Sequence, residues 1–139
     1  MTIRGSARCF SESVRDAIES NVRSIVEATA ATYGATASVK YERRYPATVN
    51  SAREAELAAS VAADMNTLMP VQVGCRPSMA SDDFGFLTQK VPGAYVWLGS
   101  GDEQHGEPLH SPSYDFNDSI LETGARYWVR LMEQALSRH

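Results

Sequence analysis

The stretch "AYVWLG", residues 94–99, is a short and continuous apolar run. A Pro-Gly turn at residues 92–93 precedes it and a long polar loop follows it. A run of this length between turn signals is typical of a strand that is buried on both faces. Such strands occur in α/β layers, where helices cover the sheet. The stretch therefore predicts a central strand of an α/β layer.

The segments around this run predict the rest of the layer. Ser51 and Glu54 form a capping box before an Ala-rich helix, and "MPVQVGC" (69–75) is apolar enough for a strand. "SDD" (81–83) opens a short helix, because first-turn acids suit the helix dipole. A loop over 99–117 then leads to a final helix, whose apolar stripe is Ile120, Leu121, Ala125, Trp128, Leu131, Met132 and Ala135.

The first third of the chain predicts strand–helix–strand. Residues 2–10 and 35–45 alternate between apolar and polar side chains, as half-buried strands do. Between them, Ser11 or Ser13 can cap a helix that Gly34 ends. This part therefore predicts half of a small sheet with one helix-covered face, and a change of composition near 46–51 marks the boundary.

Composition and charge exclude several classes of protein. The chain has 139 residues and a net charge of −4, with a pI near 5.3 and no basic run, which argues against nucleic-acid or anionic-membrane binding. No apolar stretch approaches the roughly 20 residues that cross a bilayer. The opening "MTIRGSARCF" lacks the apolar region of a signal peptide, so we expect a cytoplasmic protein.

His110 is the candidate for chemistry, within "EPLHSPSYDFND" (107–118). Zinc needs three or four ligands that converge on one point. The two other histidines, His105 and His139, do not complete a metal motif with it, and there is no H-x-H, H-E-x-x-H or cysteine cluster. From the residues alone, His110 is either a ligand to a metal whose other ligands lie elsewhere or an ordinary loop histidine.

Five blocks of the sequence, taken in order, carry a family resemblance. They are "GSARCFSESVRDAIESNVRSIVEATAATYGA", "YERRYPATVN", "PSMASDDFGFL", "KVPGAYVWLGSG" and "LHSPSYDFNDSILETGARYWVRL". Together they resemble the zinc-dependent peptidase and amidohydrolase family that includes hippurate hydrolase, aminoacylase-like enzymes and indole-acetyl-amino-acid hydrolases. The last block is the most specific, because it is close to the L-H-[SN]-P-x-[YF]-D-F-[ND] run of the hippurate hydrolase branch.

The resemblance implies a fold and a domain division. Residues 1–48 match the second half of a lid domain that usually forms the dimer contact, and residues 49–139 match the C-terminal part of the catalytic domain. We therefore expect α/β (α+β) structure: half of a ferredoxin-like lid sheet with one helix, then the C-terminal α/β part of a two-metal exopeptidase-like domain. A homo-oligomer is also implied.

The resemblance also assigns roles to two residues. His110 matches a ligand of a Zn or Mn ion, two of which occupy each active site in the family. The remaining ligands and the general-base glutamate belong to motifs that the family places before the matched region. We therefore expect no catalytic residue in this chain and no tight metal binding by it alone. Asp115 either accepts a hydrogen bond from the imidazole or, with Asp118, caps the last helix.

Arg8 matches a lid arginine that binds the carboxylate of the substrate. A guanidinium suits this role because it offers two parallel donors to a planar carboxylate. The alternative is a solvated sheet face that Arg8 shares with Arg4. The block "MASDDFGF" departs from the family pattern, since Ala80 stands where glycine is common and Asp82 where glutamate is common.

These observations support two functional hypotheses. The first is part of a metal-dependent amidohydrolase that hydrolyses N-acyl-amino acids, such as hippurate-like amides, and is inactive as this chain alone. The second is a truncated, non-catalytic relic that retains only an association module. A third class, a ligand-binding α+β regulatory domain, is disfavoured because such a domain has no need of "LHSPSYDFND".

Overall fold

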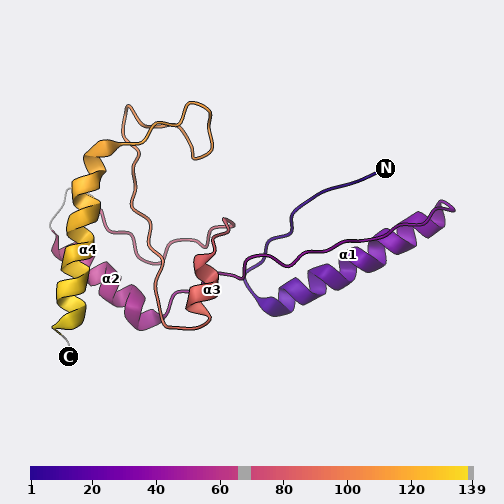
Figure 1. Cartoon of the computed structure of the whole chain (residues 1–139), viewed down its shortest axis with the longest axis horizontal. Helices are drawn as coiled ribbons and strands as arrows, with labels where there is room; N and C mark the ends of the chain where they lie inside the picture. Colours follow the sequence, from indigo (N-terminus) through magenta and orange to yellow (C-terminus); the bar gives the residue numbers. More distant parts are fainter. Residues whose placement is uncertain (66–69, 138–139) are drawn as a thin grey trace. The chain divides into compact units, whose positions relative to one another are not determined.

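The computed structural model describes residues 1–65 and 70–137. The elements in these ranges are helical: α1 (Glu12–Thr32), α2 (Ala52–Asp64), α3 (Phe84–Thr88), the 3-10 turn η1 (Asp118–Ile120) and α4 (Leu121–Leu136) (Figure 1). The chain divides into two compact units. The first unit is Met1–Val49 with Arg76–Val91, and the second unit is Asn50–Cys75 with Pro92–His139. None of the described helices is long and apolar enough to cross a membrane.

The predicted sheets are absent from the described residues, so the expectation of an α/β fold with a ferredoxin-like lid sheet is wrong. Across 1–65 and 70–137 no residue lies in a β-strand, and the segments 2–10, 35–45 and 94–99 are irregular. The same holds for 70–75 of the predicted strand 69–75, whose Met69 lies outside the described residues.

The physical reason is that a strand needs a hydrogen-bonded neighbour, whereas alternation only specifies the two faces of an extended segment. In the described ranges no backbone–backbone hydrogen bond joins 2–10 to 35–45. At the predicted central strand, the side chain of Asn50 bonds the backbone of Tyr95 instead. The amide nitrogen of Asn50 donates to Tyr95 O (2.9 Å), and Tyr95 N donates to the amide oxygen of Asn50 (2.8 Å).

Helix α1 begins and ends where the sequence predicts. The Oγ of Ser11 accepts a hydrogen bond from the backbone N–H of Val14 (3.4 Å), which confirms one of the two predicted caps. At the other end, Gly34 has a positive φ of 68°, and its N–H donates to Ala31 O (3.0 Å). Glycine is favoured there because it adopts the left-handed conformation without steric cost.

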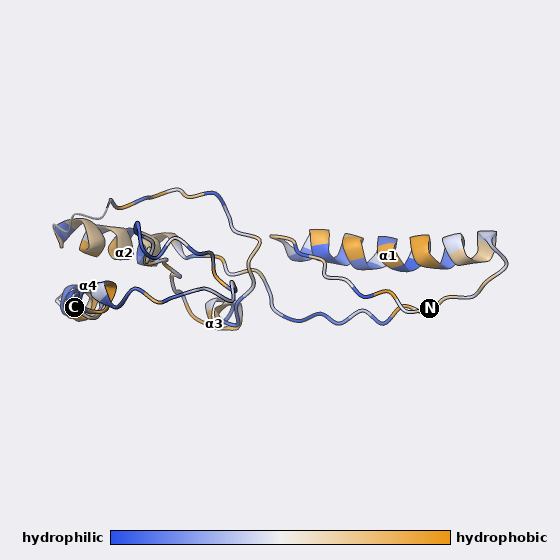
Figure 2. Cartoon of the chain, turned by 90° about the horizontal axis from the view of Figure 1, so that it is seen from above, coloured by the Kyte–Doolittle hydropathy of each residue, from blue (hydrophilic) through white to orange (hydrophobic). Residues whose placement is uncertain are grey.

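The segment 35–45 runs back along α1 and is held there by arginine side chains (Figure 1). Arg23 donates to the backbone oxygen of Val39 (2.9 Å), and Arg43 pairs with Asp16 (2.6 Å) and Glu19 (2.7 Å). Hydrogen bonds from Arg23 and then Arg43 lower the pKa of Glu19. No residue of α1 is fully buried, and Figure 2 shows apolar residues recurring among hydrophilic ones along it.

Helix α3 belongs to the first unit and packs closely on Pro46. A Cβ added at Gly85 would lie 2.7 Å from Pro46 O, so only glycine fits this contact. The rings of Tyr45 and Phe86 meet edge to face, with centroids 6.0 Å apart. The short helix predicted here is confirmed, but the acids of "SDD" precede its first turn: α3 starts at Phe84, and the side chain of Asp83 before it makes no cap hydrogen bond.

In the second unit, α2 packs against α4. Val61 and Ala58 of α2 are 1% and 5% exposed, and the hydroxyl of Tyr127 donates to Ala58 O (3.5 Å). Both helices are confirmed. The predicted capping box of Ser51 and Glu54 does not form, because the Oγ of Ser51 makes no hydrogen bond to the helix. It accepts a hydrogen bond from the N–H of Gly93 (3.2 Å) instead.

Candidate functional site

His110 lies at the third position of a tight turn in the second unit. The N–H of Ser111 donates to the carbonyl oxygen of Pro108 (3.1 Å), and His110 between them has a φ of 70°. Type II turns place a positive φ at this position, which favours glycine. A left-handed conformation costs a residue with a side chain roughly 1–2 kcal/mol.

The imidazole of His110 is exposed and available to a partner from outside the chain. Within the described ranges its ring makes no hydrogen bond or ion pair. Asp115, one candidate to orient the ring, is exposed and makes no hydrogen bond to it. The structure therefore presents the two ring nitrogens without an internal partner.

Hydrogen bonds of Ser111 hold the backbone that follows His110. Its Oγ donates to the carboxylate of Glu107 (3.1 Å) and accepts from the N–H of Ser113 (3.2 Å), while its carbonyl oxygen accepts from the N–H of Tyr114 (3.1 Å). One serine thus ties together both sides of the turn. The position of His110 is set by backbone geometry more than by contacts of its own ring.

The base of the same loop holds a polar cluster that sequence reasoning missed. Asp102 Oδ1 lies 2.7 Å from His105 Nδ1, and Asp102 Oδ2 accepts from the amide of Asn117 (2.9 Å). The hydrogen bond from His105, then those from backbone N–H groups, lower the pKa of Asp102. Neither Asp115 nor Asp118 caps the last helix: the N-cap of α4 is Ile120, without a side-chain hydrogen bond, and Asn117 caps the preceding turn η1 through Ser119 N (3.0 Å).

Two signals could have pointed to this cluster. The first is an Asx turn, in which an aspartate side chain accepts hydrogen bonds from backbone N–H groups shortly after it in the chain. Asp102 forms such a turn with the N–H groups of Gln104 and His105. Asparagine is also among the favoured N-cap residues, and Asn117 directly precedes the turn η1 that leads into α4.

Arg8 lies in the first unit and contacts the segment 79–81. Its Nη1 donates to Met79 O (2.8 Å) and to Ser81 Oγ (3.0 Å). Among the ion pairs of the described residues, none involves Arg8 or Arg4. No carboxylate among the described residues pairs with Arg8, and its Nε and Nη2 make no hydrogen bond to any of them.

The described residues do not surround His110 with further metal ligands. In the part of the chain that the structure describes, no three His, Cys, Asp or Glu side chains converge as a metal site requires. His139 lies outside the described residues. An exposed neutral imidazole is a suitable donor for Zn²⁺ or Mn²⁺, but the other ligands would have to come from elsewhere.

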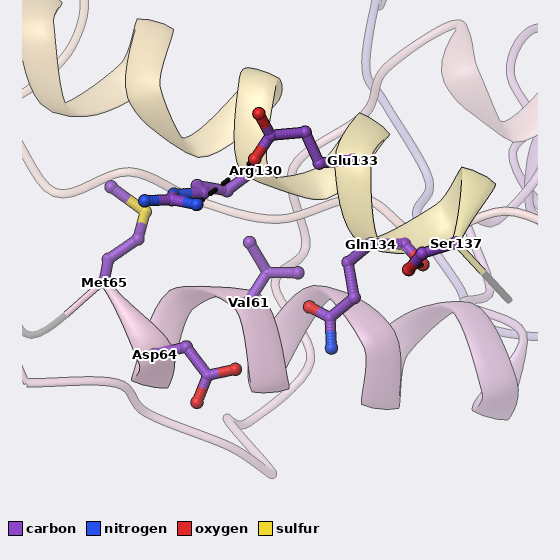
Figure 3. A pocket seen from close by; sticks show the side chains of 7 residues that line it. All are labelled: Val61, Asp64, Met65, Arg130, Glu133, Gln134 and Ser137. Carbon is purple, nitrogen blue, oxygen red and sulfur yellow. Dashed lines mark hydrogen bonds and ion pairs between the residues drawn. The ribbon is translucent and has the colours of Figure 1, made fainter.

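A groove between α2 and α4 carries none of these residues. Its walls include Val61 and Asp64 of α2, Met65 directly after it, and Arg130, Glu133 and Gln134 of α4. Arg130 is paired with Glu133 (3.2 Å) (Figure 3). The candidate site therefore belongs to the loop of His110 and not to this groove.

Comparisons with known proteins agree with the loop motif. The model of a family described as peptidase family M20/M25/M40 matches residues 5–134. The chain is 32% identical to the putative amidohydrolase YhaA of Bacillus subtilis over 88% of its length and 31% of that protein. It is 28% identical to the hippurate hydrolase of Campylobacter jejuni over 94% of its length and 33% of that protein. It thus spans about a third of these relatives.

A solved structure is similar as well. It is the Bacillus subtilis YxeP protein, described as a dinuclear metal-binding peptidase, with 26% identity and a TM-score of 0.76. The similarity covers 92% of this chain and 34% of the YxeP chain.

Proposed function

This chain belongs to the peptidase family M20/M25/M40, and from that premise we propose that it forms the C-terminal part of a metal-dependent amidohydrolase that hydrolyses N-acyl-amino acids such as hippurate. The observation that carries the proposal is His110, an exposed imidazole without an internal partner in a strained turn of the family's most specific motif. A residue kept in an unfavourable conformation needs a reason, and metal ligation supplies one.

His110 would hold one of the two metal ions of the complete enzyme. When bound, Zn²⁺ or Mn²⁺ lowers the pKa of a coordinated water and polarises the amide carbonyl. The chain contributes the ligand nitrogen and the rigid turn that aims it. The general base and the remaining ligands would come from the rest of the enzyme.

Arg8 would bind the free carboxylate of the substrate. Its Nη1 is occupied by Met79 O and Ser81 Oγ, which anchors the guanidinium while the Nε and Nη2 edge stays open. That edge offers two parallel donors with the geometry of a carboxylate. The substrate class that fits is therefore an N-acyl-amino acid with a free acid group.

Replacement of Arg8 tests this assignment. In the complete enzyme, Arg8→Ala should lower kcat/KM for N-acyl-amino acids about 10-fold to 100-fold, mainly by raising KM, because hydrogen bonds to charged groups contribute about 1.5–3 kcal/mol. The primary amides of the same substrates should lose much less. Kinetics on matched acid and amide pairs measure the difference.

Arg4→Ala is the matched control, because Arg4 is an exposed arginine of the same segment. It should leave the acid-to-amide ratio unchanged. If Arg8→Ala also leaves that ratio unchanged, Arg8 does not bind the carboxylate.

An association module remains the second candidate function, and the surface of α4 favours it. Leu121, Trp128 and Met132 follow helical spacing and are 58%, 64% and 60% exposed. Exposed apolar side chains gathered on one helix mark surfaces that associate. A second copy of the chain could cover this stripe.

Self-association of the 139-residue chain is the expected result. Light scattering at tens of micromolar, a concentration typical of weak association, should report a mass above that of a monomer. Trp128→Glu should shift the chain toward the monomer because a charge would be buried, whereas Arg126→Glu on the polar side should not. A monomeric wild type at these concentrations would contradict the prediction.

A further inference from the structure

The side chain of Asn117 closes the loop that carries His110. Its amide nitrogen donates to Ser100 O (3.1 Å) and to Asp102 Oδ2 (2.9 Å) across 17 and 15 residues. Its amide oxygen accepts from the N–H of Ser119 (3.0 Å) and from its hydroxyl (2.6 Å). Asn117 is only 5% exposed, and its side chain uses both donors and its acceptor. Such saturation is typical of a side chain that fixes backbone geometry.

Asp102 extends this closure to the first part of the loop. Its Oδ1 accepts from the backbone N–H groups of Gln104 and His105, both at 2.8 Å, and lies 2.7 Å from the His105 ring. One carboxylate thus connects the turn at 102–105 to Asn117. The backbone enters and leaves the loop at a single polar cluster, formed by Asp102, His105 and Asn117, which we call the loop clamp.

His110 sits between the loop clamp and the turn ordered by Ser111. Its φ of 70° is unfavourable for a residue with a Cβ, so an unrestrained loop would relax from it. The ring itself has no internal partner, as described above. The conformation of His110 must therefore be restrained through the backbone. The hydrogen bonds of Ser111 act next to His110, and the loop clamp acts where the two ends of the loop meet.

We propose that Asn117 is a positioning residue: by closing the loop on Ser100 and Asp102 it holds the His110 imidazole where a metal ion can take it as a ligand. The proposal rests on the proposed metal role of His110. Asn117 touches neither metal nor substrate. Asn117 acts by limiting the conformations of the loop before the ion binds. Less conformational entropy is then lost when His110 binds the ion, which is preorganisation of a ligand.

Asn117→Asp in the complete enzyme separates the two roles of this side chain. The variant keeps the oxygen that caps η1 through Ser119, but it loses the amide donors and places a carboxylate against Asp102. We expect the metal dissociation constant to rise about 10-fold to 100-fold, the range for loss of an outer partner of a metal ligand. The melting temperature of the metal-free protein should fall as well, because a side chain that is 5% exposed loses two hydrogen bonds and faces a like charge.

A swapped pair supplies the rescue. Combining Asn117→Asp with Asp102→Asn returns one amide and one carboxylate to facing positions, so the hydrogen bond can re-form with its direction reversed. Metal affinity should recover at least partly. Asp118→Asn is the control for charge, since the side chain of Asp118 takes no part in the loop clamp, and it should leave metal affinity unchanged.

A readout without metal comes from amide hydrogen exchange on the 139-residue chain. The N–H groups of Gln104 and His105 should exchange faster in Asn117→Asp, because their acceptor Asp102 loses its anchor. They should slow again in the swapped pair.

The outcomes separate this proposal from the function on which it rests. If His110→Ala weakens metal binding but Asn117→Asp does not, the positioning role is wrong and the proposed function stands. If His110→Ala leaves metal binding unchanged, the proposed function fails and this inference fails with it. If the swapped pair restores the melting temperature of Asn117→Asp but none of its metal affinity, Asn117 is only a structural residue and the positioning role is wrong.

Discussion

Replacing His110 with alanine in the complete enzyme should lower kcat/KM for N-acyl-amino acids by more than about 100-fold. Loss of an outer partner of a metal ligand already costs about 10-fold to 100-fold, and loss of the ligand itself should cost more. The imidazole is exposed and bonded to nothing within the described residues, so its removal takes away few other contacts. The measurement pairs hydrolysis of hippurate and N-acetyl amino acids with the metal content of the purified protein.

His110→Gly is the control that distinguishes loss of a ligand from loss of folding. At a φ of 70°, glycine is unstrained and alanine is not, so the glycine variant should be more stable than the alanine variant by about 1 kcal/mol. Both variants should be equally inactive. An active glycine or alanine variant that keeps its full metal content would remove His110 from the metal site.

The 139-residue chain alone should neither bind zinc tightly nor hydrolyse N-acyl-amino acids. Structural zinc sites reach apparent binding free energies of about 10–16 kcal/mol because three or four ligands share the ion. The described residues offer His110 without such a cluster around it. Absence of a general base would separately cost about 10²-fold to 10⁴-fold in rate. The two losses compound, so turnover should remain at background.

The assay uses hippurate and a panel of N-acetyl amino acids with added Zn²⁺, Mn²⁺ or Co²⁺, together with calorimetric zinc titration. Helical circular dichroism confirms that the chain is folded under the same conditions. His110→Ala is the matched control. Metal-stimulated turnover that disappears in this variant would show that the chain builds a site by itself.

The helices were predictable because their signals are local. Ser11 directly precedes α1, and Gly34 lies within one turn of its C-terminal end. The helical spacing of the apolar residues near the C-terminus predicted α4. Helical hydrogen bonds join residues four apart, so a short stretch of sequence contains the information they need. The strand predictions failed, because the alternation at 2–10 and 35–45 and the apolar run at 94–99 specify no pairing partner, and the described residues contain no strand.

The candidate site divides along the same line. The residues 109–118 identified His110, since a motif is a property of neighbouring residues. The left-handed turn at His110, the closure of its loop by Asn117 and the contact of Arg8 with Met79 and Ser81 emerged only in the folded structure. The last two join residues 15 to 73 positions apart, and such contacts depend on how the chain returns on itself. Sequence by itself determined which side chains are available for chemistry, and tertiary structure decided which of them are held in place, because hydrogen bonds over long separations form only after the intervening backbone has folded.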